Sequence, residues 1–547
     1  METISVALVL LLAVVLSSTI ARASPIALPL PLFQIALGAL IASVADLGVL
    51  LNPDIFFLLF LPPLLFLDGW RIPKEGLFRD MGAILQLALG LVVFTVLGVG
   101  FLVHWMIPTM PLAVAFALAA IVSPTDPIAV SAIAERVPVP ERLMHILEGE
   151  SLLNDASGLV CMRFAVAAML TGQFSLATAL GTFVWLAIGG IAVGVAVTWL
   201  IARAKAWVSR KFGEETGPQI LISLLIPFAA YLVAEKLNCS SILAAVAAGI
   251  TMSYVERSGA ALAVTRVRRT VVWETIQFAA NGVIFVLLGE QLPHIVTSAA
   301  SVVQQTGHVH PLWLLGYAAA ITLALAALRL AWVWTSMRFS LAWAAHRGRE
   351  RYRPGWRLIA AASVAGVRGT ITLAGVLTLP FTLYDGSPFP ARELAVFLAA
   401  AVIILSLAVA SLALPRLLRN LKLPPAPSHR EEEDRVRAAA AQAAIKAVED
   451  TGHDLGEGRA DADAYADAAA RVMQIYRWRL DAHSKTGEDV ELVHKGEAIE
   501  RRLRLAGLRA ERRTVLQYRR SRRINEETAR QLFQEIDLAE ARIGSRA

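Results

Sequence analysis

Several polar side chains gather in one short stretch of an otherwise apolar region. The segment 148–156 reads E-G-E-S-L-L-N-D-A and contains Glu150, Ser151, Asn154 and Asp155. In a helix, Ser151 and Asp155 share one face, as do Glu150 and Asn154. Because a carboxylate inside hydrocarbon is costly unless it faces a cavity or a partner, the polar residues of this stretch are candidates for a functional site. The alternative interpretation is a polar entrance to a helix.

A second cluster lies at 123–127, which reads S-P-T-D-P. Pro124 and Pro127 lack an amide hydrogen and disfavour helix in the preceding residue, so a helix crossing this stretch should break here. At membrane depth, such a break is tolerated where the freed backbone groups line a cavity or are buried in protein. Thr125 and Asp126 would then lie beside loose carbonyls, as in the ion sites of secondary transporters. The alternative is a proline kink whose aspartate is satisfied locally.

A third cluster, G-V-R-G-T-I-T at 366–372, combines helix-weakening glycines with the charge of Arg368 near the middle of an apolar run. If the apolar runs are divided into a first half of six helices, one linker helix and a second half of six helices, this run and the run around 123–127 are each the fifth helix of their half. Paired interrupted helices are the pattern of an inverted repeat. We therefore expect two repeats, at roughly 1–172 and 215–420.

Other polar residues in the apolar runs have less specific roles. Asp68 follows F-L-P-P-L-L-F at 60–66 and either pairs with a buried arginine or lies at the membrane interface. Arg163 and Arg329 are expected to be counter-charges or structural clamps. Asn281, in N-G-V-I-F-V-L-L-G, is expected to make a helix-packing hydrogen bond rather than to bind an ion.

The composition indicates that membrane helices carry these clusters. Of the 547 residues, 56% are hydrophobic and 17% are charged, and the mean hydropathy is +0.59. These values exclude a soluble globule and predict an all-α polytopic membrane protein. Thirteen apolar runs are long enough, or nearly so, to cross about 30 Å of hydrocarbon, at 4–20, 28–45, 54–68, 82–106, 112–134, 144–171, 177–202, 219–236, 239–255, 273–291, 312–338, 358–380 and 393–415.

The positive charges predict the orientation of these runs. One alternating set of loops holds the lysines and arginines of 71–79, 136–142, 203–211, 257–269 and 347–357 together with Arg22, whereas the other holds only Lys236 and Arg392. By the positive-inside rule the first set of loops is cytoplasmic. We therefore expect a protein of the cell membrane whose N-terminus lies outside the cell and whose C-terminal tail lies in the cytoplasm. The net charge of +7 is thus explained by topology, and no nucleic-acid partner is expected.

The sequence changes character after residue 422, where a P-P-A-P linker begins a tail rich in Ala, Glu and Arg. We expect a transmembrane domain at 1–422 and a cytoplasmic helical tail at 423–547. Helices are predicted at 430–450 and 460–483 with a glycine-rich break at 452–458, and Asn525 is a candidate N-cap for a last helix to 543. The tail is expected to be a solvated appendage, a regulatory or dimer-contacting element, or a contact for lipid headgroups through 512–523.

Taken together and in this order, the motifs resemble those of bacterial sodium/proton antiporters. The resemblance is to the monovalent cation:proton antiporter-1 family, which includes the animal sodium/proton exchangers. It rests on F-L-P-P-L-L-F, S-P-T-D-P, E-G-E-S-L-L-N-D-A, N-G-V-I-F-V-L-L-G and G-V-R-G-T-I-T-L-A, and it spans most of residues 4–420. It implies a fold of thirteen helices in inverted repeats, with two broken, crossing helices, and a homodimer.

The resemblance also implies roles for individual residues. Asp155 would be the ion- and proton-binding carboxylate and Asp126 the second acidic group, with a backbone carbonyl from Thr125 and a hydroxyl from Ser151. Glu150 would orient Asn154, and Arg368 would stabilise the core. Relatives with Asn-Asp at 154–155 are associated with electroneutral exchange, which implies one cation per proton. These assignments imply a site for a transient monovalent cation held by Asp155 and Asp126, with no cofactor.

We therefore expect a secondary transporter that exchanges sodium or lithium for protons and serves pH and sodium homeostasis. Oxygen ligands suit such hard cations. Burial and a second nearby carboxylate both disfavour the charged form of an acid, so cation and proton should compete for one site. Oxygen ligands alone do not set ion size, which leaves a potassium/proton antiporter open, and a passive cation channel is a more remote alternative. An enzyme is not expected, because no Ser-His pair, HExxH or Gly-Asp motif lies at a matched depth.

Overall fold

The computed structural model describes residues 2–25, 28–44, 53–127, 130–131, 139–171, 176–257, 263–305, 312–346, 355–383, 385–419, 429–457, 462–483 and 488–544. Within these ranges the protein is helical, and extended backbone pairs only at an isolated bridge between Thr382 and Pro388. The chain divides into two compact units, Met1–Lys422 and Leu423–Ala547. The P-P-A-P linker lies outside the described residues.

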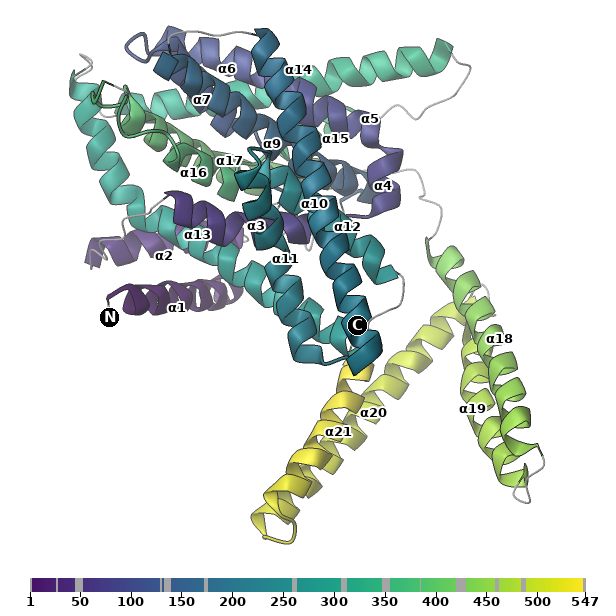
Figure 1. Cartoon of the computed structure of the whole chain (residues 1–547). Helices are drawn as coiled ribbons and strands as arrows, with labels where there is room; N and C mark the ends of the chain where they lie inside the picture. Colours follow the sequence, from purple (N-terminus) through teal and green to yellow (C-terminus); the bar gives the residue numbers. More distant parts are fainter. Residues whose placement is uncertain are drawn as a thin grey trace. The chain divides into compact units, whose positions relative to one another are not determined.

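The first unit is a bundle of mostly apolar helices (Figure 1). Its elements are α1 (Glu2–Ala23), α2 (Leu30–Val44), α3 (Pro53–Arg71), α4 (Lys74–Arg79), α5 (Met81–Leu85), the π-helical segment η1 (Gln86–Leu91), α6 (Val92–Met106), α7 (Leu112–Val122), α9 (Glu141–Thr171), α10 (Leu176–Phe212), α11 (Thr216–Lys236), α12 (Ser241–Arg257), α13 (Ala263–Gln305), α14 (Leu312–His346), α15 (Trp356–Val364), α16 (Thr370–Leu377) and α17 (Arg392–Leu418).

These helices confirm the prediction of an all-α polytopic membrane protein. In the described part of the chain, 8 helices are long and apolar enough to cross a membrane, and Leu30–Val44, Leu112–Val122 and Ser241–Glu256 form shorter apolar helices. Each predicted apolar run coincides with a helix or with a helix that is interrupted. The count of thirteen spans and the inverted repeat stay predictions.

The crossing of α3 and α12 is close because glycines lie at the contact. A Cβ atom on Gly69 of α3 would collide with the backbone carbonyl of Val246, and one on Gly249 of α12 would collide with that of Phe66. Small residues let helix backbones approach in this way where no hydrophobic force drives helices together in lipid. The crossing holds α3, which carries Asp68 in its last turn, at a defined depth.

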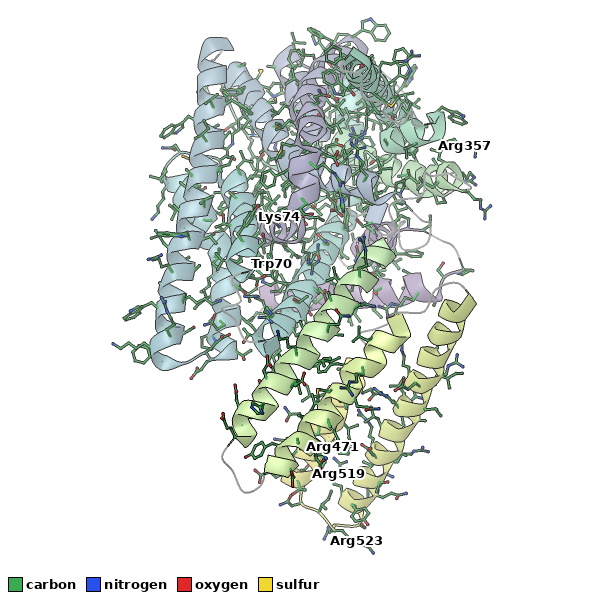
Figure 2. The ribbon with its side chains drawn as sticks, turned by 90° about the vertical axis from the view of Figure 1, so that its right-hand side faces the viewer. Trp70, Lys74, Arg357, Arg471, Arg519 and Arg523 are labelled. Carbon is green, nitrogen blue, oxygen red and sulfur yellow. The ribbon has the colours of Figure 1, made fainter. Side chains whose placement is uncertain are left out.

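Lys74 closes the C-terminal end of α3. Its side chain is buried, with 4% of the residue exposed. The Nζ atom donates hydrogen bonds to the carbonyls of Gly69, Trp70 and Ile72 at 3.1, 2.7 and 2.8 Å. The last carbonyls of a helix have no partner inside the helix, and a positive charge is favourable at this end. Lys74 and Trp70 are labelled in Figure 2.

Two helices are interrupted where the sequence predicts it. α7 ends at Val122, and residues 123–127 are not helical. α15 ends at Val364, and α16 begins at Thr370 after a non-helical stretch. Prolines produce the first interruption by removing backbone donors, and the glycines of 366–369 accompany the second.

The tail unit consists of α18 (His429–Gly456), α19 (Ala462–His483), α20 (Glu488–Arg520) and α21 (Glu526–Gly544). The predicted glycine-rich break at 452–458 is wrong over 452–456, which continue α18. Gly452 faces α19, and a Cβ atom there would lie 2.9 Å from Cβ of Ala469. This glycine therefore allows two helices to approach each other instead of ending one, and the rest of the predicted break at 458 lies outside the described residues.

The last tail helix begins as the sequence predicts. The Asn525 side-chain oxygen accepts a hydrogen bond from the Thr528 backbone N–H at 2.7 Å, which confirms Asn525 as the N-cap of α21. Arg512 of α20 pairs with Asp537 of α21 and, at 2.8 Å, with Glu540. The Asp537 hydrogen bond raises the pKa of the Arg512 guanidinium above its ordinary value. These exposed pairs join α20 and α21. Arg519 lies in the last turn of α20, and Arg523 lies in the turn that connects it to α21 (Figure 2).

Candidate cation site at the two interrupted helices

The two interruptions touch each other and share hydrogen bonds. The backbone N–H of Asp126 donates to the Val367 carbonyl at 2.7 Å, and Nε of Arg368 donates to the Val122 carbonyl at 2.8 Å. The backbone N–H of Thr370 donates to the Asp126 carboxylate at 3.3 Å. Each interruption thereby satisfies backbone groups that the other one frees, which is the condition for irregular backbone at membrane depth.

Arg368 is buried at this junction, with 5% of the residue exposed. Besides the Val122 carbonyl, its guanidinium contacts the carbonyl of Gly366, and its backbone N–H donates to the Ser406 hydroxyl on α17 at 3.1 Å. Backbone carbonyls from both interruptions therefore bind one fixed positive charge. This geometry is compatible with the core-stabilising role that the resemblance implies for Arg368.

Gly369 lets the Asp126 carboxylate approach the second interruption. A Cβ atom on Gly369 would collide with the Asp126 carboxylate group. The N-terminus of α16 follows immediately, where the N–H of Thr370 reaches that carboxylate. A helix N-terminus favours a negative charge, so the sequence G-T at 369–370 fixes the location of Asp126.

A cavity lies beside this junction and encloses about 510 Å³ of space, including the part that is open to solvent. Its walls come from α3, α9, α13, the first turn of α16 and both interruptions. The lining residues are Leu61, Leu64, Leu65, Asp68, Pro124, Thr125, Asp126, Ser151, Asp155, Gln277, Asn281, Gly369, Thr370, Ile371 and Thr372.

Oxygen atoms concentrate in the walls of this cavity. Asp155, Ser151 and Thr125 are 5%, 9% and 6% exposed, so the protein encloses them on most sides. Asp126 lines the same cavity, and so does Asp68, whose side chain is exposed to it. Carboxylates that share one low-dielectric space disfavour each other's charged form, so a bound proton or cation stabilises the group. The arrangement can hold a small cation and can exchange it for a proton.

A buried polar network lies behind the cavity. Arg329 of α14 binds Glu150 of α9 through two nitrogens, one of them at 2.6 Å, and its Nε donates to the Ala362 carbonyl at 3.0 Å. The Thr125 hydroxyl donates to Glu150 at 3.3 Å and accepts from the Asn154 amide at 3.0 Å. Glu150 and Arg329 are 1% and 2% exposed. The charge of Glu150 is thus matched by Arg329, and Thr125 connects Glu150 to Asn154.

The structure brings together most of the residues singled out in the sequence. Asp155, Asp126, Ser151 and Thr125 line the cavity, while Glu150, Asn154 and Arg368 are buried outside its lining. The sequence left Asp68 and Arg329 open, and the structure places the first in the cavity and the second on Glu150. Arg163 is exposed on α9.

Sequence reasoning missed the cavity location of four polar residues and one pairing. Thr370, Thr372, Gln277 and Asn281 line the cavity. The first two belong to a motif that was recognised, so their hydroxyls were a usable signal. The pairing of Glu150 with Arg329 joins residues 179 positions apart, and nothing local to either residue indicates the other.

Comparison with known proteins gives three kinds of similarity. The sequence profile of the family described as "Sodium/hydrogen exchanger, transmembrane" matches residues 8–420. The uncharacterized Na(+)/H(+) exchanger YjcE of Escherichia coli is 42% identical over 550 residues, which is 99% of both chains. The sodium, potassium, lithium and rubidium/H(+) antiporter of Bacillus pumilus is 44% identical over 416 residues, which is 76% of this chain and 61% of that protein.

The fold is also that of a solved antiporter structure. The sodium proton antiporter MjNhaP1 of Methanocaldococcus jannaschii matches with a TM-score of 0.58 and 19% identity over 77% of this chain and 99% of that chain. Since the family profile covers most of the chain and YjcE is similar over nearly all of it, the chain belongs to the sodium/hydrogen exchanger family of membrane antiporters.

Proposed function

We propose that this cation/proton antiporter exchanges sodium or lithium for protons across the cell membrane, one for one, by alternating access. The observation that carries the proposal is the cavity at the junction of the two interruptions, which Asp126 and Asp155 both line. The exchange would serve sodium and pH homeostasis. Family membership supports cation/proton exchange as such, and the choice of ion and the stoichiometry are the proposal.

In the proposed mechanism, Asp155 and Asp126 bind either a cation or a proton. The hydroxyl of Ser151 and the backbone carbonyl of Thr125 complete an oxygen site that suits a hard monovalent ion. A bare buried charge is costly to move through the membrane, so only the loaded carrier reorients. Cation and proton compete for the same carboxylates, and this competition couples the two fluxes.

The polar network behind the cavity would orient the site residues and would add no further negative charge to the cation site. Arg329 neutralises Glu150, so that carboxylate is not available to the cation. Asn154 presents an uncharged amide next to Asp155 and donates to Thr125. A neutral residue at this place is compatible with one cation per proton. Moving one uncompensated charge across 100 mV would add about 2.3 kcal/mol to each cycle.

A second candidate is a broader specificity that includes potassium. The antiporters of Bacillus pumilus and Bacillus subtilis, at 44% and 43% identity, are named for exchange of sodium, potassium, lithium and rubidium for protons. In the cavity described here, carboxylate, hydroxyl and carbonyl oxygens are ligands that larger alkali cations also accept. Ion selectivity then depends on the size of the site.

The proposal is tested in proteoliposomes that contain the full chain and a trapped pH-sensitive dye. Addition of sodium, lithium, potassium and rubidium in turn should give proton movement with sodium and lithium at the lowest concentrations. Clamping the membrane potential with valinomycin and potassium should leave the sodium-driven rate unchanged. A rate that follows the clamped voltage contradicts one-for-one exchange, and cation flux without proton movement indicates a channel.

The site assignment is tested by Asp155→Asn, which removes one negative charge at constant shape and should abolish exchange. Asp385→Asn is the matched control, because Asp385 is exposed and its carboxylate is held in a turn by hydrogen bonds from Ser387 at 2.9 and 2.6 Å. The control should exchange like the parent. Full exchange by a folded Asp155→Asn variant contradicts the assignment.

A further inference from the structure

Asn281 lies on a helix that the proposed cation site does not otherwise use. α13 is continuous through the cavity region and packs along α2, and it belongs to neither interruption. Gln277 and Asn281 are one helical turn apart, so they share a face, and both line the cavity. α13 therefore offers two amide side chains to the cavity that also contains Asp126 and Asp155.

The two amides differ in what binds their oxygen atoms. Oε1 of Gln277 accepts a hydrogen bond from Nη1 of Arg71 at 2.7 Å. Oδ1 of Asn281 is buried and has no hydrogen-bond partner among the described residues. Leaving a buried acceptor unsatisfied costs about 1–3 kcal/mol, and such groups in native proteins call for an explanation.

A cation in the cavity would supply the missing partner. An amide oxygen is a hard, neutral ligand of the type that binds calcium in proteins, and carbonyl oxygens replace the hydration shell of potassium in channels. The carboxylates of the cavity supply charge, whereas Asn281 supplies an oxygen without adding charge. Such a ligand raises cation affinity while leaving the number of exchanged charges unchanged.

We propose that Oδ1 of Asn281 is a ligand of the transported cation, contributed by α13 to the oxygen site of the two interruptions. This inference rests on the proposed function and adds to it a residue that helps to determine cation affinity. Asn281 can reach a cation at the interruptions only while α13 lies beside them. In this structure it does, because α13 and both interruptions line the same cavity.

The test compares Asn281→Ala with Gln277→Ala in the full-length protein in proteoliposomes, with sodium and lithium as the probes. Removing the Asn281 oxygen should raise the half-saturating cation concentration about tenfold, as expected for the loss of one ligand, while the maximal rate stays within about twofold. Gln277→Ala should leave the half-saturating concentration near the parent value, because its oxygen is already bound to Arg71.

Asn281→Asp provides the conservative comparison, since it retains an oxygen at the same place. It should bind sodium at least as well as the parent at alkaline pH. Binding itself is measured by the rise in the midpoint of thermal unfolding on addition of sodium, which should be smaller for Asn281→Ala than for the parent. This second measurement needs no transport activity.

Unchanged half-saturation in a folded Asn281→Ala variant overturns the inference, and so does an equal rise in Gln277→Ala, which would point to general cavity polarity. Failure of the proposed function looks different. In that case the parent protein shows no sodium-dependent proton movement, or Asp155→Asn exchanges normally. A parent protein that exchanges sodium for protons, an inactive Asp155→Asn variant and an Asn281→Ala variant with unchanged half-saturation together reject the inference alone.

Discussion

Two kinds of carboxylate lie close together in this protein. Glu150 has an arginine bound to both of its oxygens, whereas Asp68, Asp126 and Asp155 line a cavity. A paired charge is held in place by its partner, and a carboxylate facing a cavity can take up a cation or a proton. The difference separates an acid that is paired with an arginine from the acids that we propose as the ion site, which the sequence places in the same or neighbouring motifs.

The first prediction concerns the pairing of Glu150 with Arg329. Glu150→Gln leaves Arg329 buried without its countercharge, so unfolding should become easier by about 3–5 kcal/mol. The midpoint of thermal unfolding in detergent measures this loss. Glu393→Gln is the control: Glu393 also pairs with an arginine, Arg392, but its side chain is 42% exposed, and the expected change is below about 1 kcal/mol. Equal midpoints for the two variants would contradict the structural role.

The second prediction concerns Gly369. In Gly369→Ala the new methyl group would occupy the space of the Asp126 carboxylate, which must move. Exchange should fall at least about tenfold, a loss that corresponds to about 1.4 kcal/mol. Sodium-driven proton flux measures it. Gly375→Ala on the same half-helix is the control, since its Cβ atom would be 3.4 Å from the nearest side-chain atom. Normal flux in Gly369→Ala would show that the location of Asp126 is not critical.

Helix α3 has a C-terminal cap that lies outside the cavity but holds the end of the helix that carries Asp68. It carries Asp68 in its last turn, glycines set its distance from α12, and the Lys74 ammonium group binds its final carbonyls. The chain turns directly after this cap into α4. The end of α3, and with it one acidic side of the cavity, therefore depends on a lysine outside the cavity.

The third prediction is that Lys74→Met destabilises this end of α3. The substitution keeps the length of the side chain but removes a charged donor from three carbonyls, at a cost of about 3 kcal/mol. The midpoint of thermal unfolding should fall, and exchange should weaken because Asp68 loses its fixed location. Lys236→Met is the matched control, because Lys236 is exposed in the last turn of α11. A stable, fully active Lys74→Met protein would refute the capping role.

The cavity and its polar network belong to one of the two compact units, and the tail forms the other. Every lining residue of the cavity and the Glu150–Arg329 pair belong to the unit Met1–Lys422, and the family profile ends at residue 420. The tail unit contains four helices in its described part. The boundaries at 422 and 423 agree with the change in composition along the sequence.

The fourth prediction is that truncation after Lys422 leaves exchange intact. The shortened protein should fold, respond to sodium in the thermal assay and move protons within about twofold of the full chain, because units with their own cores fold independently. Proteoliposome flux provides the measurement. A folded truncation without exchange would assign the tail an essential role, and altered pH or sodium dependence at a normal rate would indicate regulation.

The fifth prediction concerns orientation, which we propose from the positive-inside rule. A cysteine introduced at the exposed Ser521 should react with a membrane-impermeant thiol reagent in everted vesicles but not in right-side-out spheroplasts. A cysteine at the exposed Thr382, in the loop between α16 and α17, should behave in the opposite way. The parent protein reports the background from Cys161 and Cys239. Labelling of each position from the side opposite to the expected one would reverse the topology, and labelling of both positions from the same side would contradict a membrane crossing by α17.

Local sequence rules were sufficient to predict the helices, the two interruptions and the acidic residues that lie near them. Apolar length predicts spans, and the two prolines at 124 and 127, three residues apart, remove two backbone donors from one short stretch. A single proline is not enough by itself, because Pro227 and Pro293 lie inside continuous helices. The same rules failed at Gly452, which continues a helix because α19 packs closely against it. A glycine permits either outcome, and its neighbour in space decides.

Which groups each buried polar side chain contacts was decided only by the packing of the helices. Arg329 reaches Glu150 across 179 positions, Asp68 comes to the cavity of Asp126 and Asp155, and Asn281 enters the same wall. A charge or amide in an apolar run signals that it needs a partner, because hydrocarbon provides none. Which group becomes that partner depends on how the helices cross, and the crossing results from contacts between residues far apart in the chain.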